Sequence, residues 1–142
     1  MIYTKMTKKA LNLCFEAHKD QLDKSGVPYV FHPFHLAEQM KDEQTTIVAL
    51  LHDVVEDSDI TIEDLKEEGF DNKVLEAIIL LTHGKDVKYE YYVLKIKENP
   101  IARAVKIADL KHNSDLSRME NVDQKVLERR EKYLKALAIL EE

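Results

Sequence analysis

The residues best suited to chemistry gather in one short segment, 52–57, which reads His-Asp-Val-Val-Glu-Asp. On a helix, His52 and Glu56 would lie one turn apart on one line, and Asp53 and Asp57 one turn apart on the next. The segment holds three carboxylates and one imidazole but no Lys or Arg. Such a patch is either the solvated face of an amphipathic helix or a set of ligands whose mutual repulsion a cation would relieve.

A divalent cation needs more ligands than one helix can aim at a point, so the second interpretation requires donors elsewhere. His32 stands at the start of another expected helix, and Asp109 lies among apolar residues, where an unpaired carboxylate would be costly. Taken singly, His32 can be a cap-region histidine and Asp109 a surface residue. For each residue alone these accounts are the better ones, and the cation interpretation requires both side chains to converge on His52 and Asp53.

Helices are expected to position these residues, because apolar side chains recur at three- and four-residue steps along most of the chain. The expected helices cover residues 4–22, 32–40, 44–57, 61–69, 72–81, 85–98, 100–116 and the segment that Asp123 caps. The third helix carries a core-facing stripe that ends next to the patch, with Ile47, Leu50, Leu51 and Val54. We therefore predict an all-α protein, with one domain over 1–142 built as a compact bundle of seven or eight helices.

Composition limits the class of protein. The chain has 142 residues, of which 44% are hydrophobic and 34% charged, so one domain with one core is expected rather than a disordered chain. Only 3 Gly and 3 Pro leave little material for the many turns of a sandwich or barrel. The single cysteine, Cys14, allows neither an intramolecular disulfide nor a cysteine zinc cluster. A reducing, cytoplasmic setting fits.

Charge and hydropathy limit the partners. A formal net charge of −6 argues against a nucleic-acid polymer as ligand, because that affinity comes from a basic surface. A small phosphorylated ligand remains compatible, since a bound divalent cation reverses the local field. No apolar run approaches the roughly 18–20 residues of a membrane span, so we expect no membrane association and no signal peptide.

The order of the candidate ligands resembles that of the HD-domain metal-dependent phosphohydrolases. His32 precedes His52 by 20 residues, and Asp109 follows Asp53 by 56 residues. Further segments are similar to the hydrolase domain of RelA/SpoT-type enzymes; they are Ala17–Gln21, Lys24–Tyr29, His32-Pro33, Ala49–Ser58, Lys106–Asp109 and His112-Asn113. The resemblance is strongest over 7–116, and 117–142 is expected to be a packing helix of the same HD-type domain.

The resemblance implies a small stand-alone hydrolase that removes the 3′-pyrophosphate of the alarmone (p)ppGpp with Mn²⁺. By position, the implied metal ligands are His32, His52, Asp53 and Asp109. The implied catalytic carboxylates, which activate and position water, are Glu56 and Asp57. The implied substrate contacts are Lys24 and Ser25 in the pocket loop and Asn113 near the ribose. Glu56, one turn beyond His52, could take the proton of the water.

Two further histidines are assigned from their neighbours. His18 lies on the apolar side of the first helix and is expected to be a hydrogen-bonded core residue. His112, beside Asn113, is expected to support the site by contacting a ligand of the metal.

The sequence departs from the family's usual pattern where the nucleotide would be read. The family usually has Arg, Arg, Arg and Thr at the positions that hold Asp23, Leu110, Asp115 and Leu116 here. An Arg grips phosphate in a fork, whereas an Asp repels it. If Asp23 and Asp115 face the pocket, Asp23→Arg should raise kcat/KM for ppGpp severalfold.

Two other functions stay open on these departures. One is an HD phosphohydrolase that acts on another nucleotide, and the other is a weakly catalytic nucleotide-binding regulatory module. The intact Glu56 and Asp57 speak against the regulatory module, which has no evident need for catalytic carboxylates.

Overall fold

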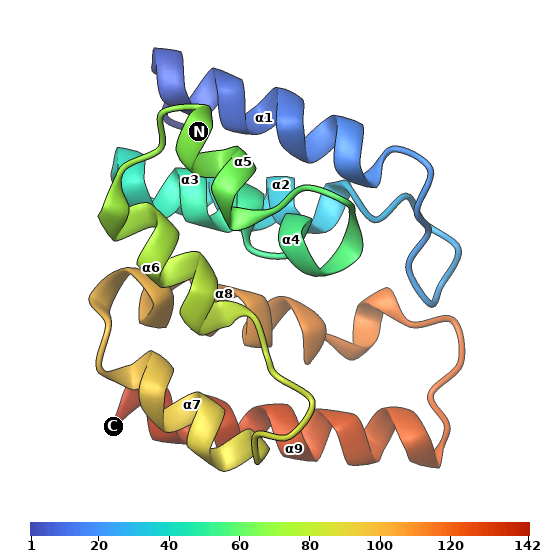
Figure 1. The fold of residues 1–142 in the computed structure, drawn as a ribbon. Helices are drawn as coiled ribbons and strands as arrows, with labels where there is room; N and C mark the ends of the chain where they lie inside the picture. Colours follow the sequence, from blue (N-terminus) through green and yellow to red (C-terminus); the bar gives the residue numbers. More distant parts are fainter.

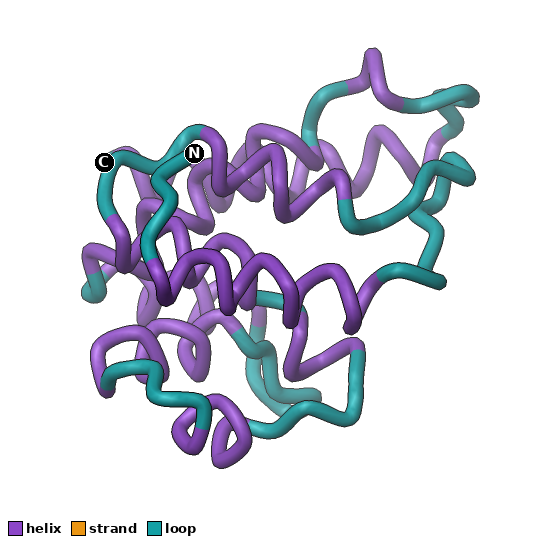
Figure 2. Tube along the Cα trace, turned by 90° about the horizontal axis from the view of Figure 1, so that it is seen from above, coloured by secondary structure: helices purple, strands orange, loops and turns teal.

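The structure, a computed structural model, describes residues 1–142 and is all-helical, which confirms the expected fold class. Its helices are α1 (Lys5–His18), α2 (Phe31–Glu38), α3 (Glu43–Leu51), α4 (Val54–Asp57), α5 (Ile62–Glu67), α6 (Asn72–Leu81), α7 (Tyr89–Lys97), α8 (Pro100–Asn113), the short 3₁₀ helix η1 (Leu116–Arg118) and α9 (Gln124–Glu141). Figure 1 shows α1 on one side of the bundle and α7 with α9 on the opposite side. Figure 2 shows helices joined by loops. None of these helices combines the length and apolar character of a membrane span.

Helix α3 lies at the centre of the bundle and fixes the position of the site. It packs against α1, α2, α6 and α8, and every residue from Thr45 to Leu51 is buried. Asp42 caps its start by accepting a hydrogen bond from the Thr45 amide at 2.8 Å. Each large apolar side chain buried here contributes about 1.5–3 kcal/mol to folding, so the end of α3 is held by the core itself.

The third expected helix, 44–57, is interrupted where its chemistry begins. Helix α3 ends at Leu51 and α4 starts at Val54, with the His52-Asp53 dyad in the turn between them. Asp53 has φ −106° and ψ −1°, which departs from helical geometry. The prediction that His52 and Glu56 lie on one helical line was therefore wrong. The turn directs His52 into the core, where it is 4% exposed, and leaves Glu56 exposed.

The first expected helix also ends early, at His18 rather than residue 22. The chain instead closes a tight loop over residues 21–29, in which the Asp23 amide donates to Val27 O and the Tyr29 amide to Gln21 O, both at 2.8 Å. Gly26 makes the reversal with a φ of 82°, which other residues rarely adopt. This loop 21–29 carries Lys24 and Ser25 toward the site.

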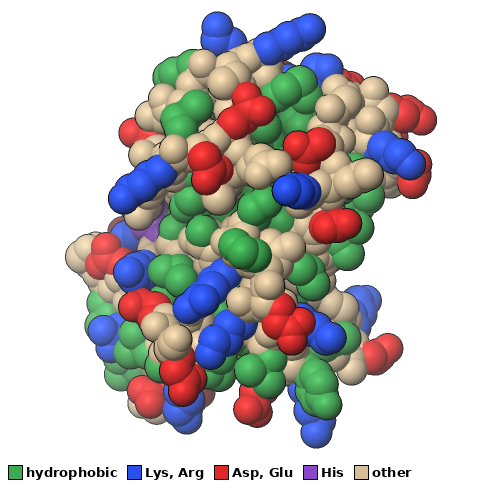
Figure 3. All heavy atoms as spheres, turned by 90° about the vertical axis from the view of Figure 1, so that its left-hand side faces the viewer, with side chains coloured by type: hydrophobic (Ala, Val, Ile, Leu, Met, Phe, Trp, Pro, Cys, Tyr) green, Lys and Arg blue, Asp and Glu red, His purple; other side chains and the backbone are tan.

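Other boundaries differ by a few residues or agree. Helix α7 starts at Tyr89 rather than 85, and α8 ends at Asn113 before η1 begins. Helix α6 runs over 72–81 as predicted, and Asp123 caps α9 as predicted. On the face drawn in Figure 3, basic and acidic side chains lie interspersed with apolar ones.

Candidate functional site

Three buried side chains from separate parts of the chain meet at one point, and each offers an atom that can bind a metal. They are His32 on α2, His52 at the end of α3 and Asp109 on α8, and one ligand atom of each lies within 4.8 Å of the others. His32 Nε2 lies 2.8 Å from Asp109 Oδ1, and His52 Nε2 lies 3.7 Å from the same oxygen. The two imidazole rings meet edge to face with centroids 5.7 Å apart.

Asp53 adjoins this trio. Its Oδ2 lies 3.1 Å from His52 Nε2, and the Tyr29 hydroxyl donates a hydrogen bond to the same carboxylate. Burial opposes ionisation of Asp53, but His52 outweighs it and lowers the pKa of the carboxyl to about 2. Asp53 thus carries a negative charge beside two imidazoles and a second carboxylate.

The donor set fits a divalent cation, because His52 Nε2 is buried and its polar neighbours are two carboxylates that form no aligned hydrogen bond with it. The other ring nitrogen, Nδ1, lies 2.7 Å from the carbonyl oxygen of Ala49 and donates to it. His52 Nε2 therefore faces Asp53 and Asp109, and once its proton is removed it has an electron pair free for a cation. Burial lowers the pKa of His52, but the two carboxylates hold it well above the ordinary value, so the point attracts positive charge.

Asp109 has three hydrogen-bond partners, of which His32 is described above and the others are Lys106 and Asn113. It pairs with Lys106 Nζ at 2.9 Å, and Asn113 donates from Nδ2 to its Oδ1 at 3.1 Å. Burial raises the pKa of Asp109, but Lys106 and then His32 and His52 outweigh it, so the pKa lies well below the ordinary value. Asp109 is therefore a charged oxygen donor in a fixed orientation.

A cleft of about 200 Å³ opens beside this cluster. Glu56 lines it together with His52, Asp53 and Asp109. Its Oε1 accepts a hydrogen bond from the His83 amide at 2.9 Å. Partial burial, with the charges of Asp53 and Asp57, outweighs the hydrogen bond from the His83 amide and raises the pKa of Glu56, as suits a group that accepts a proton.

Asp57, the second expected catalytic carboxylate, lies elsewhere. It is exposed, does not line the cleft, and its Oδ2 accepts a hydrogen bond from Gln21 Nε2 at 3.3 Å. The structure thus places Glu56 in the cleft beside the cluster and places Asp57 next to Gln21, the first residue of loop 21–29.

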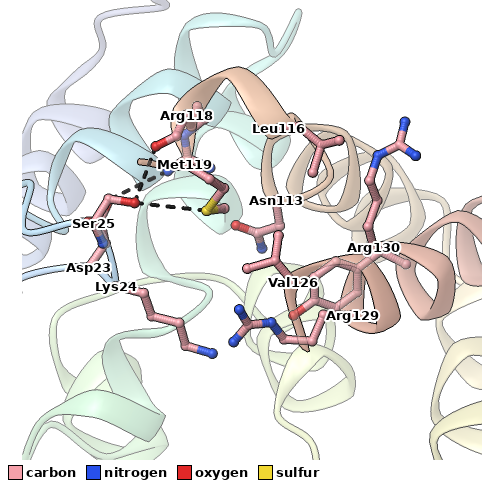
Figure 4. Close-up of a pocket in the computed structure, with 11 residues that line it drawn as sticks. Asp23, Lys24, Ser25, Asn113, Leu116, Arg118, Met119, Val126, Arg129 and Arg130 are labelled. Carbon is pink, nitrogen blue, oxygen red and sulfur yellow. Dashed lines mark hydrogen bonds and ion pairs between the residues drawn. The ribbon is translucent and has the colours of Figure 1, made fainter. Parts of the chain in front are cut away.

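Figure 4 shows a second pocket, with a volume of about 220 Å³. Lys24, Ser25 and Asn113, the three residues expected to contact substrate, all line it. Ser25 Oγ donates to the carbonyl oxygen of Arg118 at 3.2 Å. Asn113 and Tyr133 line both spaces, so the second pocket adjoins the cleft beside His32, His52 and Asp109.

The second pocket also holds three cations that sequence reasoning missed, Arg118, Arg129 and Arg130. Arg129 of α9 reaches into the same space as Lys24 (Figure 4), and neither forms an ion pair with a carboxylate. Burial and then Arg129 lower the pKa of Lys24. In sequence, Arg129 belongs to a charged Glu-Arg-Arg-Glu run that is typical of a solvated helix face, so no signal marked it.

The four departures from the family pattern occupy different places. Asp23 and Leu116 line the second pocket, whereas Leu110 is fully buried in the core. Asp115 does not line the pocket; it is exposed and accepts hydrogen bonds from Ser117. The expectation that Asp115 repels a ligand in the pocket was therefore wrong.

Asp23 is engaged by the protein itself. Its Oδ1 accepts hydrogen bonds from the amides of Ser25 at 2.8 Å and Val27 at 3.0 Å. Its Oδ2 lies 3.7 Å from Arg118 Nη2. Asp23 thus holds loop 21–29 together, and Arg118 offsets its charge.

His18 is the core histidine that the sequence predicted. It is fully buried, and its Nδ1 lies 2.8 Å from Gln21 Oε1. Its ring also packs at 4.9 Å from Tyr29, the partner of Asp53.

Comparisons with known proteins agree with this geometry. The sequence model of the family described as "HD domain" matches residues 10–137. A guanosine-3′,5′-bis(diphosphate) 3′-pyrophosphohydrolase of Aquifex aeolicus is 35% identical over 114 residues, which cover 72% of this chain and 16% of that protein. The bifunctional (p)ppGpp synthase/hydrolase SpoT of Escherichia coli is 30% identical over 124 residues, or 77% of this chain and 18% of SpoT. The chain thus spans less than a fifth of these two relatives.

A solved structure has the same fold. It is described as a metazoan ortholog of SpoT that hydrolyses ppGpp, and it superposes with a TM-score of 0.75 at 24% identity. The superposition covers 99% of this chain and 87% of that one.

Proposed function

Because the chain belongs to the HD domain family, we propose that it is a metal-dependent phosphohydrolase that removes the 3′-pyrophosphate of (p)ppGpp. One observation carries the proposal. A buried cluster of His32, His52 and Asp109 lies beside a cleft that adjoins a second pocket, and Lys24 and Arg129 line that pocket without pairing with a carboxylate.

We assign the metal to His32, His52, Asp109 and the adjoining Asp53. Two imidazoles and two carboxylates suit Mn²⁺, which we propose as the native ion, and Fe²⁺, Co²⁺ and Zn²⁺ have compatible ligand preferences. When bound, such an ion polarises a phosphoryl oxygen and makes a coordinated water more acidic.

Glu56 is the proposed general base. It lines the cleft next to Asp53, and its raised pKa gives the carboxylate more affinity for a proton than an exposed Glu has. The His83 amide fixes one of its oxygens, leaving the other to accept a proton from the attacking water. The resemblance also names Asp57, which lies outside the cleft. In this proposal Asp57 acts indirectly, by accepting a hydrogen bond from Gln21 at the start of loop 21–29.

Lys24 and Arg129 are the proposed binding groups for the phosphates remote from the reaction. Two cations that face one another without a carboxylate repel each other, and a bound anion removes that repulsion. Asn113 lies between the two ends and is positioned to contact the sugar that joins them. A ligand with charged phosphate groups at two separate positions matches this arrangement.

Hydrolysis of another nucleotide is the alternative that the site itself supports. Asp23 and Leu116 line the second pocket where the family usually has Arg and Thr. These side chains change the wall of the pocket but not the cluster. The alternative therefore keeps the reaction and changes the substrate.

The test is a Mn²⁺-supplemented screen of the purified protein against ppGpp, pppGpp and a panel of nucleotides, with released phosphate and pyrophosphate measured separately. We expect pyrophosphate from ppGpp, no activity after treatment with a chelator, and recovery on adding Mn²⁺. Asp53→Ala is the matched negative control, because it removes a proposed ligand while the core helices stay intact. Faster turnover of another nucleotide would favour the alternative, and no turnover of any would overturn the proposed function.

A further inference from the structure

We propose that His112 is a positioning residue for His32, whose ring it orients so that Nε2 can give its electron pair to the metal. This inference rests on the metal centre of the proposed function and adds a residue to it. The carrying observation is the contact between the two rings, with His32 Nδ1 only 2.6 Å from His112 Nδ1.

The two nitrogens of the His32 ring face different partners. Nε2 lies 2.8 Å from Asp109 Oδ1, inside the cluster, and Nδ1 faces His112, outside it. At 2.6 Å the two Nδ1 atoms share one proton, which one ring donates and the other accepts. If a metal takes the electron pair of Nε2, the proton of a neutral His32 stands on Nδ1, and His112 must accept it.

The surroundings hold His112 in this role. It follows Asp109 by one turn of α8, and its carbonyl oxygen accepts a hydrogen bond from Arg118 Nη1 at 2.8 Å. The rings of His32 and His112 are nearly parallel, at 6°. The ring of His35, one turn after His32 on α2, stacks on His112 at 4.1 Å. His112 therefore has little freedom to turn its Nδ1 away from His32.

An imidazole in this place does what a carbonyl or carboxylate partner cannot. Without metal, His32 can donate from Nε2 to Asp109 while its Nδ1 accepts from His112. If Nε2 were to bind a metal, His32 would carry its proton on Nδ1, and His112 would accept that hydrogen bond with its own proton on Nε2. An imidazole can thus serve as donor or acceptor at Nδ1, so the contact is satisfied in either tautomer of the pair.

The test separates the hydrogen bond from the packing of the ring. His112→Asn places an amide, which can accept or donate, near the position of Nδ1 but removes the stacked ring. His112→Phe keeps a stacked ring and removes the hydrogen bond. His35→Phe is the control, because it preserves the stack on His112 and leaves the His32 contact untouched.

Mn²⁺ affinity is measured by calorimetry on each folded variant. We expect His112→Phe to weaken it by about 10- to 100-fold, as for other partners of metal-ligating histidines, while His112→Asn and His35→Phe stay near wild type. In the Zn²⁺-loaded wild type, ¹H–¹⁵N correlation spectra should show the His32 proton on Nδ1. That measurement reports on the contact even if a variant fails to fold.

Three results would overturn the inference. These are wild-type Mn²⁺ affinity in His112→Phe, an equal loss in the Asn and Phe variants, or a His32 proton on Nε2 in the loaded protein. Failure of the proposed function looks different: the wild type would bind Mn²⁺ with the expected variant pattern and hydrolyse no nucleotide.

Discussion

The two ends of the site are held by the protein in opposite ways. At the metal end, His32, His52 and Asp109 are at most 6% exposed, and each also contacts a residue that fixes its orientation. At the cationic end, Lys24 and Arg129 are more exposed and form no ion pair. The first end is built from helices of the core, and the second from loop 21–29 and the outer helix α9.

This difference teaches where the fold can tolerate change. A buried charge must keep its partner, because removing one member of a buried pair leaves the other uncompensated at a cost of about 3–5 kcal/mol. A partly exposed cation loses little when its surroundings change, since water screens it. The reaction should therefore be fixed by the core, and the choice of substrate should be adjustable at the surface.

The largest expected effect is at Asp109, where the site and the fold coincide. Asp109→Asn should abolish Mn²⁺ binding and hydrolysis, because it neutralises a proposed ligand of the same shape. It should also lower the free energy of unfolding by about 3 kcal/mol, because Lys106 loses the carboxylate 2.9 Å from its Nζ. Calorimetry with Mn²⁺ and urea unfolding measure the two effects.

A second substitution separates those two losses. Adding Lys106→Met removes the unpaired ammonium, so the double variant should regain much of the stability but no metal binding. Recovery of Mn²⁺ binding in the double variant would contradict the assignment of Asp109 as a ligand.

The next effect is at Glu56, which lies in the cleft but outside the cluster. Glu56→Gln should lower kcat about 10²-fold with unchanged Mn²⁺ affinity, because the amide keeps the hydrogen bond from His83 and cannot take a proton. Asp57→Asn is the matched control on the same helix and should lower kcat much less. If both variants lost the same activity, the proton would not go to Glu56 alone.

The pH dependence gives an independent check on Glu56. Its raised pKa means that the carboxylate is protonated at higher pH than the ordinary value of 4.5. Activity that needs the ionised form is present above the pKa and lost as pH falls through it. The acid limb of kcat/KM should therefore lie above pH 4.5 and change shape in Glu56→Gln.

A smaller effect is expected at the cationic end. Arg129→Ala should raise KM for ppGpp about tenfold, the equivalent of one charge-assisted hydrogen bond, with kcat nearly unchanged. Lys125→Ala removes the same charge one turn earlier on α9, outside the pocket, and should leave KM within about twofold. Equal effects from the two variants would mean that α9 acts only through its overall field.

The same contrast explains what the sequence predicts and what it misses. The all-α bundle and most helix positions follow from hydrophobic periodicity and from caps such as Asp123. The convergence of His32, His52 and Asp109 follows from the resemblance of their order to that of the HD-domain family. The break at the His52-Asp53 dyad has no such signal, because Val54 continues the apolar stripe in sequence. Only packing around α3 turns the chain there.

The cationic end could be predicted only in part from the sequence, for a different reason. Lys24 and Ser25 were predicted from a local motif, but Arg129 comes from a helix with no motif and meets Lys24 only in three dimensions. Whether Asp115 faces the pocket is left open by the sequence, and the turn into η1 places it outside the pocket lining. Whether a residue of an exposed loop or outer helix contacts a ligand depends on how the backbone runs in three dimensions. Hydrophobic periodicity does not predict this.

The smallest effect concerns Asp23, where sequence and structure give opposite expectations. From sequence alone, Asp23→Arg should raise kcat/KM for ppGpp severalfold by replacing a repulsive charge. In the structure, Asp23 Oδ1 accepts hydrogen bonds from the amides of Ser25 and Val27, and Oδ2 faces the guanidinium of Arg118. An Arg there would lose both loop hydrogen bonds and meet a like charge, so stability should fall by about 1 kcal/mol and kcat/KM should not rise.

Asp23→Asn separates the charge from the fold of loop 21–29. The Asn carbonyl oxygen can still accept the Ser25 and Val27 amides, while the negative charge at the pocket wall is gone and Arg118 becomes free to attract phosphate. Partial screening at the pocket mouth limits the gain, so KM for ppGpp should fall only about two- to threefold, with kcat unchanged. Steady-state kinetics and thermal unfolding of both variants decide the matter. A severalfold rise in kcat/KM for Asp23→Arg at wild-type stability would contradict this expectation. It would show that an added positive charge aids ppGpp binding more than the loss of the Asp23 hydrogen bonds in loop 21–29 harms it.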